Sequence, residues 1–220
     1  MIIDHTNRFY SNILPNGALI YSMHIVKNII PKVKTKRNWV TIDCKQCCDD
    51  AIVFIHSNVD FERYEYLRKY KNLILVASQE YTVQELKKRK LADHVIYLPL
   101  SVDTGELRKY KNQKPHNREG TCYAGRPDKP YVDGLRLHKN IDMLTGLTHP
   151  DMLRRLNNYK YCYAVGITAI EAKFMGCTIL PFDKRYPDTR IWKIIDGEYA
   201  AKLLQNKLDK IDYNKNSGKG

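Results

Sequence analysis

Residues 167–183, with the sequence ITAIEAKFMGCTILPFD, combine an acidic side chain, a helix N-terminus and a following strand. Glu171 is the one acidic residue of the expected helix, which ends at Gly176. The N–H groups and the dipole of a helix N-terminus favour an anion, and a nearby carboxylate can accept hydrogen bonds from ribose hydroxyls. This stretch therefore predicts a nucleotide pocket, and a solvated helix face is the ordinary alternative. The backbone donors expected there belong to Gly166, Ile167 and Thr168.

A basic loop is the second candidate for phosphate recognition. The sequence YAGRPDK spans residues 123–129 and begins within an apolar strand. Its small residues let the backbone approach a ligand, Arg126 can clamp a phosphate through two N–H groups, and Lys129 offers a point charge. Arg136 and Lys139 are further candidates. The ordinary alternative is a basic surface loop after a strand.

Asp60 and His56 are the candidate general bases of the chain. Both lie in FIHSNVD, residues 54–60, just past the carboxyl end of an expected strand. A carboxylate or an imidazole within hydrogen-bond reach of a hydroxyl group can take its proton during group transfer. The ordinary alternatives are a helix N-cap for Asp60 and a polar strand end for His56.

The chain is strongly basic. Its 220 residues carry a formal net charge of +13 and have a pI of about 9.4. Such an excess favours polyanionic partners, nucleic acid among them, and a soluble basic surface is the alternative. The basic residues gather in KVKTKR at 32–37, KKRK at 87–90 and RKYKNQK at 108–114. The residues predicted to bind nucleic acid are Lys34, Lys36, Arg37, Lys87, Lys88, Arg89 and Lys90.

Short apolar runs alternate with amphipathic segments, which predicts an α/β fold with parallel sheets. Strands are expected at residues 38–42, 51–57, 72–78 and 94–100, and again at 121–125, 140–147, 161–166 and 177–182. Helices are expected at residues 17–30, 60–70, 79–92, 150–159, 167–175 and 196–211. Pro31 is expected to end the first helix, and Pro150 suits the first turn of the fourth.

Residues 109–120 have no hydrophobic period and are rich in Pro, Asn and Gly, which indicates a linker. The linker divides the chain into two compact Rossmann-like units at 1–108 and 121–211, and a disordered tail follows at 212–220. Open parallel sheets bind ligands beyond the carboxyl ends of their strands. We therefore expect both sheets to face a central cleft, where the segment that begins at Gly17 meets the basic loop and the Glu171 helix.

In the order of its motifs the chain resembles glycosyltransferases of the type-B fold, which have two Rossmann-like domains. EAKFMG at 171–176 is similar to the family's acidic motif, E-A-M-A-x-G, and YAGR at 123–126 is similar to its basic loop. Lys129 follows Arg126 more closely than the family's lysine does. Residues 76–103 are similar to the crossover region of the family, and the resemblance covers about residues 72–185.

The resemblance implies an enzyme that moves a sugar from a nucleotide diphosphate, here a UDP-sugar, to a hydroxyl group, with no resident cofactor. Glu171 would hold the ribose, while Arg126 and Lys129 would offset the charge that develops on the leaving diphosphate. An inverting reaction would use Asp60 or His56 as its base, whereas a retaining one would need neither in that role.

The acceptor is inferred from a looser resemblance. Residues 12–29 are similar to the early loop and helix of phage DNA glucosyltransferases, and the basic surface fits duplex DNA. A hydroxymethylated DNA base is therefore the expected acceptor. One alternative keeps the fold but changes the acceptor to a cell-wall polymer, a protein or a small molecule. Another makes the protein a noncatalytic binder of a nucleotide or of DNA.

Other classes are disfavoured by missing motifs. The sequence has no D-x-D, no Walker P-loop and no G-x-G-x-x-G, which argues against metal-dependent type-A glycosyltransferases, nucleotide hydrolases and dehydrogenases. CKQCC at 44–48 supplies half of a zinc site, so no metal is expected. The chain shows neither an export signal nor an apolar run of about 20 residues, so the expected location is the cytoplasm.

Overall fold

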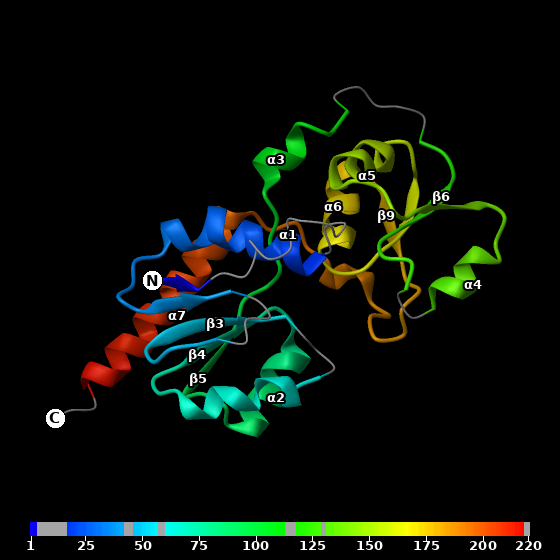
Figure 1. Cartoon of the computed structure of the whole chain (residues 1–220). Helices are drawn as coiled ribbons and strands as arrows, with labels where there is room; N and C mark the ends of the chain where they lie inside the picture. The colour runs from blue at the N-terminus through cyan, green and yellow to red at the C-terminus, as the bar shows by residue number, and fades with distance from the viewer. Residues whose placement is uncertain (4–16, 42–45, 57–59, 113–117, 129–130, 218–220) are drawn as a thin grey trace. The chain divides into compact units, whose positions relative to one another are not determined.

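The computed structural model describes the chain except for residues 4–16, 42–45, 57–59, 113–117, 129–130 and 218–220. The protein is an α/β protein with two parallel sheets, one of five strands and one of four (Figure 1). The chain folds into two compact units, each with one sheet. Unit 1 comprises Met1–Ser11, Ser22–Pro99 and Gly197–Gly220, and unit 2 comprises Asn12–Tyr21 and Leu100–Asp196.

The sheet of unit 1 has the strand order β1-β2-β3-β4-β5, and every neighbouring pair is parallel. Its strands are β1 Ile2–Ile3, β2 Asn38–Val40, β3 Ala51–Ile55, β4 Ile74–Ala77 and β5 His94–Tyr97. Every residue of β3 and β4 is buried, which explains why these strands are apolar without alternation. β5 is an edge strand, with β4 as its single partner among the described residues.

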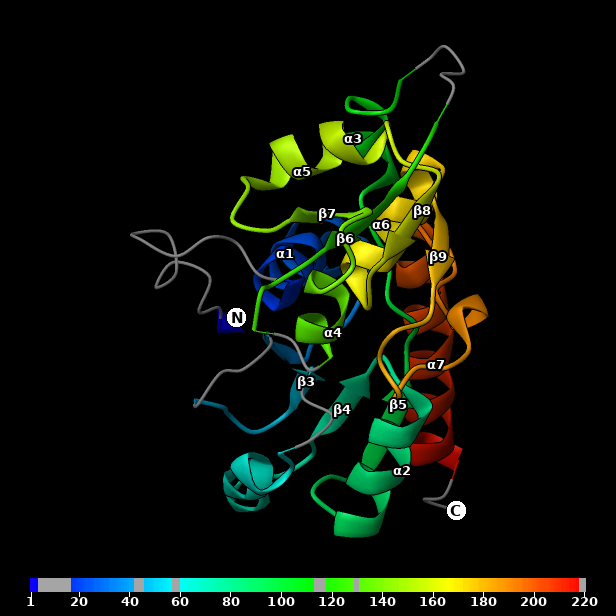
Figure 2. The same cartoon turned by 90° about the vertical axis from the view of Figure 1, so that its right-hand side faces the viewer.

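Helical elements cover both faces of this sheet (Figure 1). On one face, α2 (Glu80–Arg89) and the 3-10 helix η4 (Glu62–Lys69) join β3 and β4 in a buried apolar cluster. Their contributions are Tyr64, Leu67, Val83 and Leu86. On the other face, α7 (Gly197–Ser217), which runs beside β5 in Figure 2, packs against the π-helix η2 (Ile25–Ile29).

The first helical segment changes its geometry along its length. α1 (Gly17–His24) continues as η2 and then as the 3-10 turn η3 (Ile30–Lys32). The sequence predicts that Pro31 ends the helix before it, whereas the structure places Pro31 in the first positions of η3. The first turn of a helix leaves its N–H groups without intrahelical acceptors, so a residue that lacks an N–H is tolerated there.

The sheet of unit 2 has the strand order β7-β6-β8-β9 and is also parallel throughout. Its strands are β6 Thr121–Ala124, β7 Ile141–Leu144, β8 Tyr161–Tyr163 and β9 Thr178–Leu180. The connecting helices are α4 Val132–Arg136, α5 His149–Leu156 and α6 Ile167–Met175, and the 3-10 turn η5 (Thr189–Ile191) follows β9. α3 (Thr104–Arg108) precedes the sheet and packs against α6.

The strand orders of the two sheets have different consequences for ligand binding. In unit 1 the strands follow one another in chain order, so successive connections all run in the same direction across the sheet. In unit 2 the chain passes from β6 to β7 on one side and then returns to β8 on the other side of β6. The connections that leave β6 and β8 therefore diverge, and open α/β sheets bind ligands at such a switch point.

The structure contains all eight predicted strands in shortened form, and α6 has its predicted bounds. Four short elements are not foreseen: β1, α3, α4 and η5. The terminal helix differs from the prediction in two ways. α7 runs to Ser217, where a tail from residue 212 is expected, and it belongs to unit 1, although the sequence analysis places it in the second unit. Its buried residues Ala201, Leu204 and Leu208 lie on the helix that packs on η2 and η3, and this apolar contact decides the assignment.

Candidate functional site

Four segments leave the sheet of unit 2 at one edge, because its four strands are parallel. They begin at Gly125, Thr145, Ala164 and Pro181. The first contains the basic loop, the second leads into α5, and the third leads into α6 with Glu171. The carboxyl edge of this sheet therefore carries the segments in which the sequence predicts phosphate and ribose contacts.

The N-terminus of α6 presents backbone donors without a side-chain cap. Its N-cap residue, Gly166, has φ 66° and ψ −139°, a left-handed conformation that favours glycine. A Cβ at this position would meet no atom of the described residues within 4 Å, so the space beside the helix end is open. Ile167 and Thr168 lie in the first turn, where N–H groups have no intrahelical acceptor. This end of α6 is suited to an anion.

Glu171 is buried, and only one of its carboxylate oxygens has a hydrogen-bond partner. The residue is 2% exposed, so it does not lie on a solvated helix face. Its Oε1 lies 2.8 Å from Nε2 of His149. Its Oε2 is also buried and has no hydrogen-bond partner among the described residues. An unsatisfied buried acceptor is costly, and a ligand hydroxyl that donates to Oε2 would remove that cost.

His149 is the site residue that sequence reasoning misses. Thr148 caps α5 and Pro150 lies in its first turn, which holds His149 at the helix start, and α5 packs beside α6. Burial lowers the pKa of His149, but the hydrogen bond to Glu171 and the charges of Glu171 and Glu106 outweigh it and raise that pKa above its usual value. No spacing signal links two residues on different helices.

Tyr123 ties the basic loop to the sheet. Its hydroxyl donates a hydrogen bond to the backbone oxygen of Arg126 at 2.7 Å, and burial raises the pKa of Tyr123, which keeps the proton on this donor. Gly125, with φ 152°, follows β6, and a Cβ there would lie 2.8 Å from the Tyr123 hydroxyl. The close approach explains why glycine occupies this position.

Arg126 is paired inside its own loop. Its Nε and Nη2 donate to the two carboxylate oxygens of Asp128 at 2.9 and 2.7 Å. The side chains are 53% and 65% exposed, so water screens the pair and it contributes little to stability. A diphosphate can therefore take the place of the Asp128 carboxylate.

The other basic candidates of this loop are partly described. Arg136 donates to Asp133 at 3.0 Å and to the backbone oxygen of Pro127 at 3.1 Å, which places it beside the loop. Lys139 is exposed. Lys129 lies outside the described residues, and its phosphate contact stays a prediction.

We expect Arg126→Ala to weaken UDP-sugar binding by about tenfold, because a charge-assisted hydrogen bond contributes roughly 1.5 kcal/mol or more. Asp128→Asn should strengthen binding, by about two- to threefold, because a neutral amide competes less with phosphate for the guanidinium. Lys129→Ala should have a smaller effect than Arg126→Ala. Isothermal titration with UDP-glucose measures all three affinities. Weaker binding by Asp128→Asn, or a larger effect of Lys129→Ala, would contradict a diphosphate contact at Arg126. Arg136 and Lys139 would then be the next candidates for that contact.

An ion pair with a buried carboxylate follows β9. Asp183 is 2% exposed, and it accepts hydrogen bonds from Nε and Nη2 of Arg185 at 2.9 and 2.5 Å. The backbone N–H of Arg185 donates to the same carboxylate at 3.0 Å. An Asp-x-Arg pair of similar geometry recurs at Asp188 and Arg190 but is exposed. Sequence reasoning did not single out either pair.

The predicted general bases lie in unit 1. His56 is half-buried and Asp60 is exposed, and residues 57–59 between them are outside the described ranges. The N-cap alternative for Asp60 is wrong, because η4 begins at Glu62 and Phe61 occupies the cap position. Proton transfer by Asp60 or His56 stays a prediction. So does a ligand contact at Gly17, the first residue of α1.

The predicted nucleic-acid-binding residues divide into two groups. Arg37 donates to the backbone oxygen of Asn72 and pairs with Asp212, Lys88 pairs with Glu85, and Arg89 pairs with Glu65. The other four side chains are exposed and form no ion pair within the described part of the chain. These are Lys34, Lys36, Lys87 and Lys90.

Comparison with protein-family models and with curated proteins returned no match. Among the helices that the structure describes, none has the length and apolarity needed to cross a bilayer. The described His, Cys, Asp and Glu side chains form no group of three that could hold a metal ion. Cys44, one of the possible zinc ligands, lies outside these ranges.

Proposed function

We propose that the protein is a glycosyltransferase of the type-B kind, with two Rossmann-like units. It would transfer a sugar from a UDP-sugar to the hydroxyl group of a hydroxymethylated base in DNA. One observation carries the proposal. Among the described residues, the buried Glu171 carboxylate has no hydrogen-bond partner for Oε2, and the glycine N-cap of its helix has no atom near its Cβ position. That helix follows β8, one of the two strands at the switch point of the sheet.

Each site residue would then have a distinct role. The donor diphosphate would lie at the N–H groups of α6, and a ribose hydroxyl would donate to Glu171 Oε2. Since the carboxylate is buried, His149 or a neighbouring side chain must move aside to admit the ribose. Arg126 would exchange Asp128 for the diphosphate and stabilise the charge that develops there.

The transfer step needs only the donor, the acceptor and a base from the protein. The acceptor oxygen forms a bond to the anomeric carbon of the sugar while the bond between that carbon and the diphosphate oxygen breaks. The electron pair of the broken bond leaves with UDP. Asp60 or His56 takes the acceptor proton.

The experiment is a transfer assay with UDP-glucose as the donor and two duplexes of the same sequence, one with cytosine and one with hydroxymethylcytosine. Mass spectrometry of the DNA should show an added hexose on the hydroxymethylated duplex alone, because an unmodified base offers no such nucleophile. Thermal shift should show stabilisation by roughly 2.7 kcal/mol when UDP-sugar is present at about 100 times its dissociation constant.

Three outcomes would change the proposal. Transfer to a different hydroxyl compound would leave the enzyme class but replace the acceptor. Binding of UDP-glucose without transfer or hydrolysis would indicate a noncatalytic binding protein. Absence of stabilisation by any nucleotide or nucleotide sugar would remove the nucleotide site itself.

A further inference from the structure

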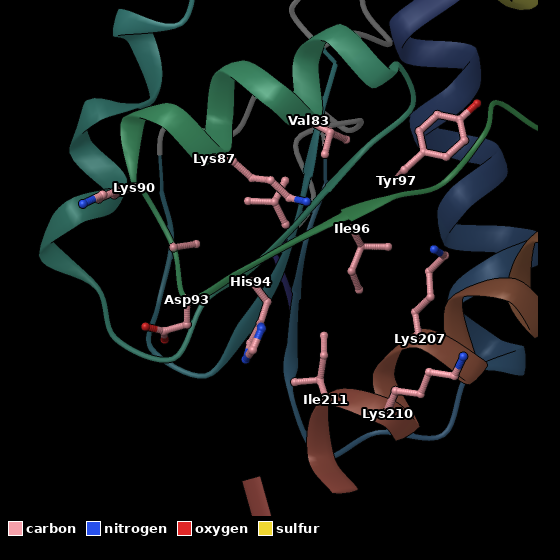
Figure 3. A pocket seen from close by; sticks show the side chains of 12 residues that line it. Val83, Lys87, Lys90, Asp93, His94, Ile96, Tyr97, Lys207, Lys210 and Ile211 are labelled. Atoms are coloured by element: carbon pink, nitrogen blue, oxygen red, sulfur yellow. The ribbon is translucent and has the colours of Figure 1, made fainter. Parts of the chain in front are cut away.

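A hollow of about 620 Å³ lies at the free edge of β5 in unit 1 (Figure 3). Its walls come from the end of α2, from residues 92–97 and from one face of α7. Because α2 and α7 cover opposite faces of the sheet, the hollow is flanked by a helix on each side of the strand edge. It therefore joins segments that are more than 100 residues apart in the chain.

The walls of the hollow are cationic. Asp93 is the one carboxylate among the lining residues, and it lies at the opposite end from the two α7 lysines (Figure 3). His94 also lines the hollow. Four lysines outnumber the single acidic group, which gives this cavity an excess of positive charge. They are Lys87, Lys90, Lys207 and Lys210.

The lysines of the hollow lack counter-ions in the described part of the chain, in contrast to their neighbours. Lys88 and Arg89 lie between Lys87 and Lys90 in the sequence, yet their side chains pair with glutamates at 2.7 and 3.2 Å. Lys202, one or two turns before the lining lysines of α7, pairs with Glu198 at 3.6 Å. Along α2 and α7, the described lysines without an ion pair therefore border the hollow, and the paired cations Lys88, Arg89 and Lys202 lie outside it.

The edge of β5 adds backbone donors to this charge. The N–H of Leu98 donates to the backbone oxygen of Ala77 at 2.9 Å, toward β4. Backbone groups alternate in direction along a strand, so those of Val95 and Tyr97 face the free edge. Each of these residues presents one N–H and one C=O at the edge, so the lysine ammonium groups are what favours an anion with several acceptor oxygens.

The basic surface continues along α7 beyond the hollow. The backbone N–H of Lys34 donates to the side chain of Gln205 on α7 at 2.6 Å, which places the exposed Lys34 beside that helix. Gln205 also donates to the carboxylate of Asp209 at 2.8 Å, so the cations are separated along the surface. Separate cations on α2, on α7 and at Lys34 fit a polymer of phosphates better than a single phosphate ion. An acidic peptide is the less suitable occupant. If it extended the sheet, it would have only the four residues of β5 to pair with, and the lysines of both helices flank that short edge.

We infer that the hollow at the β5 edge binds the phosphodiester backbone of the DNA acceptor. This inference rests on the proposed function, in which DNA is the acceptor. Lys87, Lys207 and Lys210 act as point charges on successive phosphates, and each neutralised phosphate releases counter-ions. The site positions the DNA strand and reads no base sequence.

The test compares two double variants of the full chain that each lower the formal net charge by two, from +13 to +11. Lys207→Gln with Lys210→Gln removes charges from the hollow, whereas Arg68→Gln with Lys202→Gln removes two paired charges of unit 1 that lie outside it. Fluorescence anisotropy with labelled duplex DNA gives the affinity between ~50 and ~200 mM salt. The hollow variant should show a salt slope smaller by about 2, since each lost phosphate contact lowers it by roughly 0.9. The control should keep the original slope.

Each contrary result overturns the inference in a different way. Equal losses in both variants would show that DNA binds the general basic surface. No DNA binding at low salt, or binding of polyglutamate in its place, would remove DNA as the occupant. Displacement of DNA from the hollow by inorganic phosphate at equal phosphate concentration would assign the site to the free ion.

A separate measurement distinguishes this inference from the proposed function. UDP-glucose affinity should be unchanged in both double variants, because their substitutions lie in unit 1 and Glu171 and Arg126 belong to unit 2. If the hollow does not bind DNA while Glu171-dependent UDP-glucose binding persists, the inference fails and the donor site stands. If the hollow binds DNA and no nucleotide sugar binds, the glycosyltransferase proposal fails and the anion site stands.

Discussion

Glu171→Gln is expected to weaken UDP-sugar binding by about 10- to 100-fold while the fold stays intact. Hydrogen bonds to a charged acceptor contribute roughly 1.5–3 kcal/mol, and the amide loses that charge while it keeps the shape of the side chain. Isothermal titration with UDP-glucose measures the loss. Glu198→Gln is the matched control, because Glu198 is an exposed glutamate near the start of a helix in unit 1. Unchanged donor affinity in folded Glu171→Gln would remove the ribose role.

The same substitution should have a characteristic effect on stability. The pKa of His149 is raised above its ordinary value of 6.5 by its contacts with Glu171, against the opposing effect of burial. A pKa that is higher in the folded state stabilises the fold below about pH 6.5, and this stabilisation is lost as the pH rises through the raised pKa. The protein with Glu171 should therefore be more stable than Glu171→Gln near pH ~6. This difference in stability should shrink or reverse above pH ~8.

Thermal unfolding of both proteins across this pH range checks the coupling. Above the raised pKa, the folded protein holds a buried carboxylate beside a neutral imidazole, and glutamine avoids the desolvation of that charge. A difference in unfolding temperature that is independent of pH would show that contact with Glu171 does not raise the pKa of His149. Lower donor affinity together with undiminished stability would identify Glu171 as a residue kept for binding.

Arg185→Met is expected to destabilise the protein by about 1.5–3 kcal/mol, because it removes two charge-assisted hydrogen bonds that the buried Asp183 carboxylate accepts. The side chain of Asp183 is 0% exposed, while that of Arg185 is 35% exposed. Methionine fills a similar volume, so the lost charge is the main change. Urea unfolding at neutral pH measures the free energy of unfolding.

Arg190→Met is the matched control for that prediction. Arg190 and Asp188 form the same Asp-x-Arg arrangement, with hydrogen bonds of 2.8 and 2.9 Å. Their side chains are 90% and 46% exposed, so water screens the charges and the unfolding transition should not move measurably. Equal destabilisation by the two methionine variants would show that burial of Asp183 is not the cause. Asp183→Leu combined with Arg185→Met should recover part of the loss.

The residue pattern was sufficient to predict the α/β class of the fold, the places of its central strands and the bounds of α6. Strands buried on both faces must be apolar along their whole length, and this is why AIVFI and ILVA are recognisable as β3 and β4. Glycines at positions 166 and 176 delimit α6, because each has a positive φ that other residues rarely adopt. Glu171 could be singled out for the same reason, as the acidic residue of a helix with clear ends.

Tertiary packing decided what these elements bring together. The place of β6 between β7 and β8 creates the switch point of unit 2, and strand order depends on contacts between segments that are distant in the chain. Packing of α5 against α6 gives Glu171 its partner His149, which is 22 residues away. The apolar side of α7 packs against η2, and so Lys207 and Lys210 line the same hollow as Lys87. Local sequence specifies helices and strands through periodicity, but these neighbours follow from which apolar faces are buried against each other.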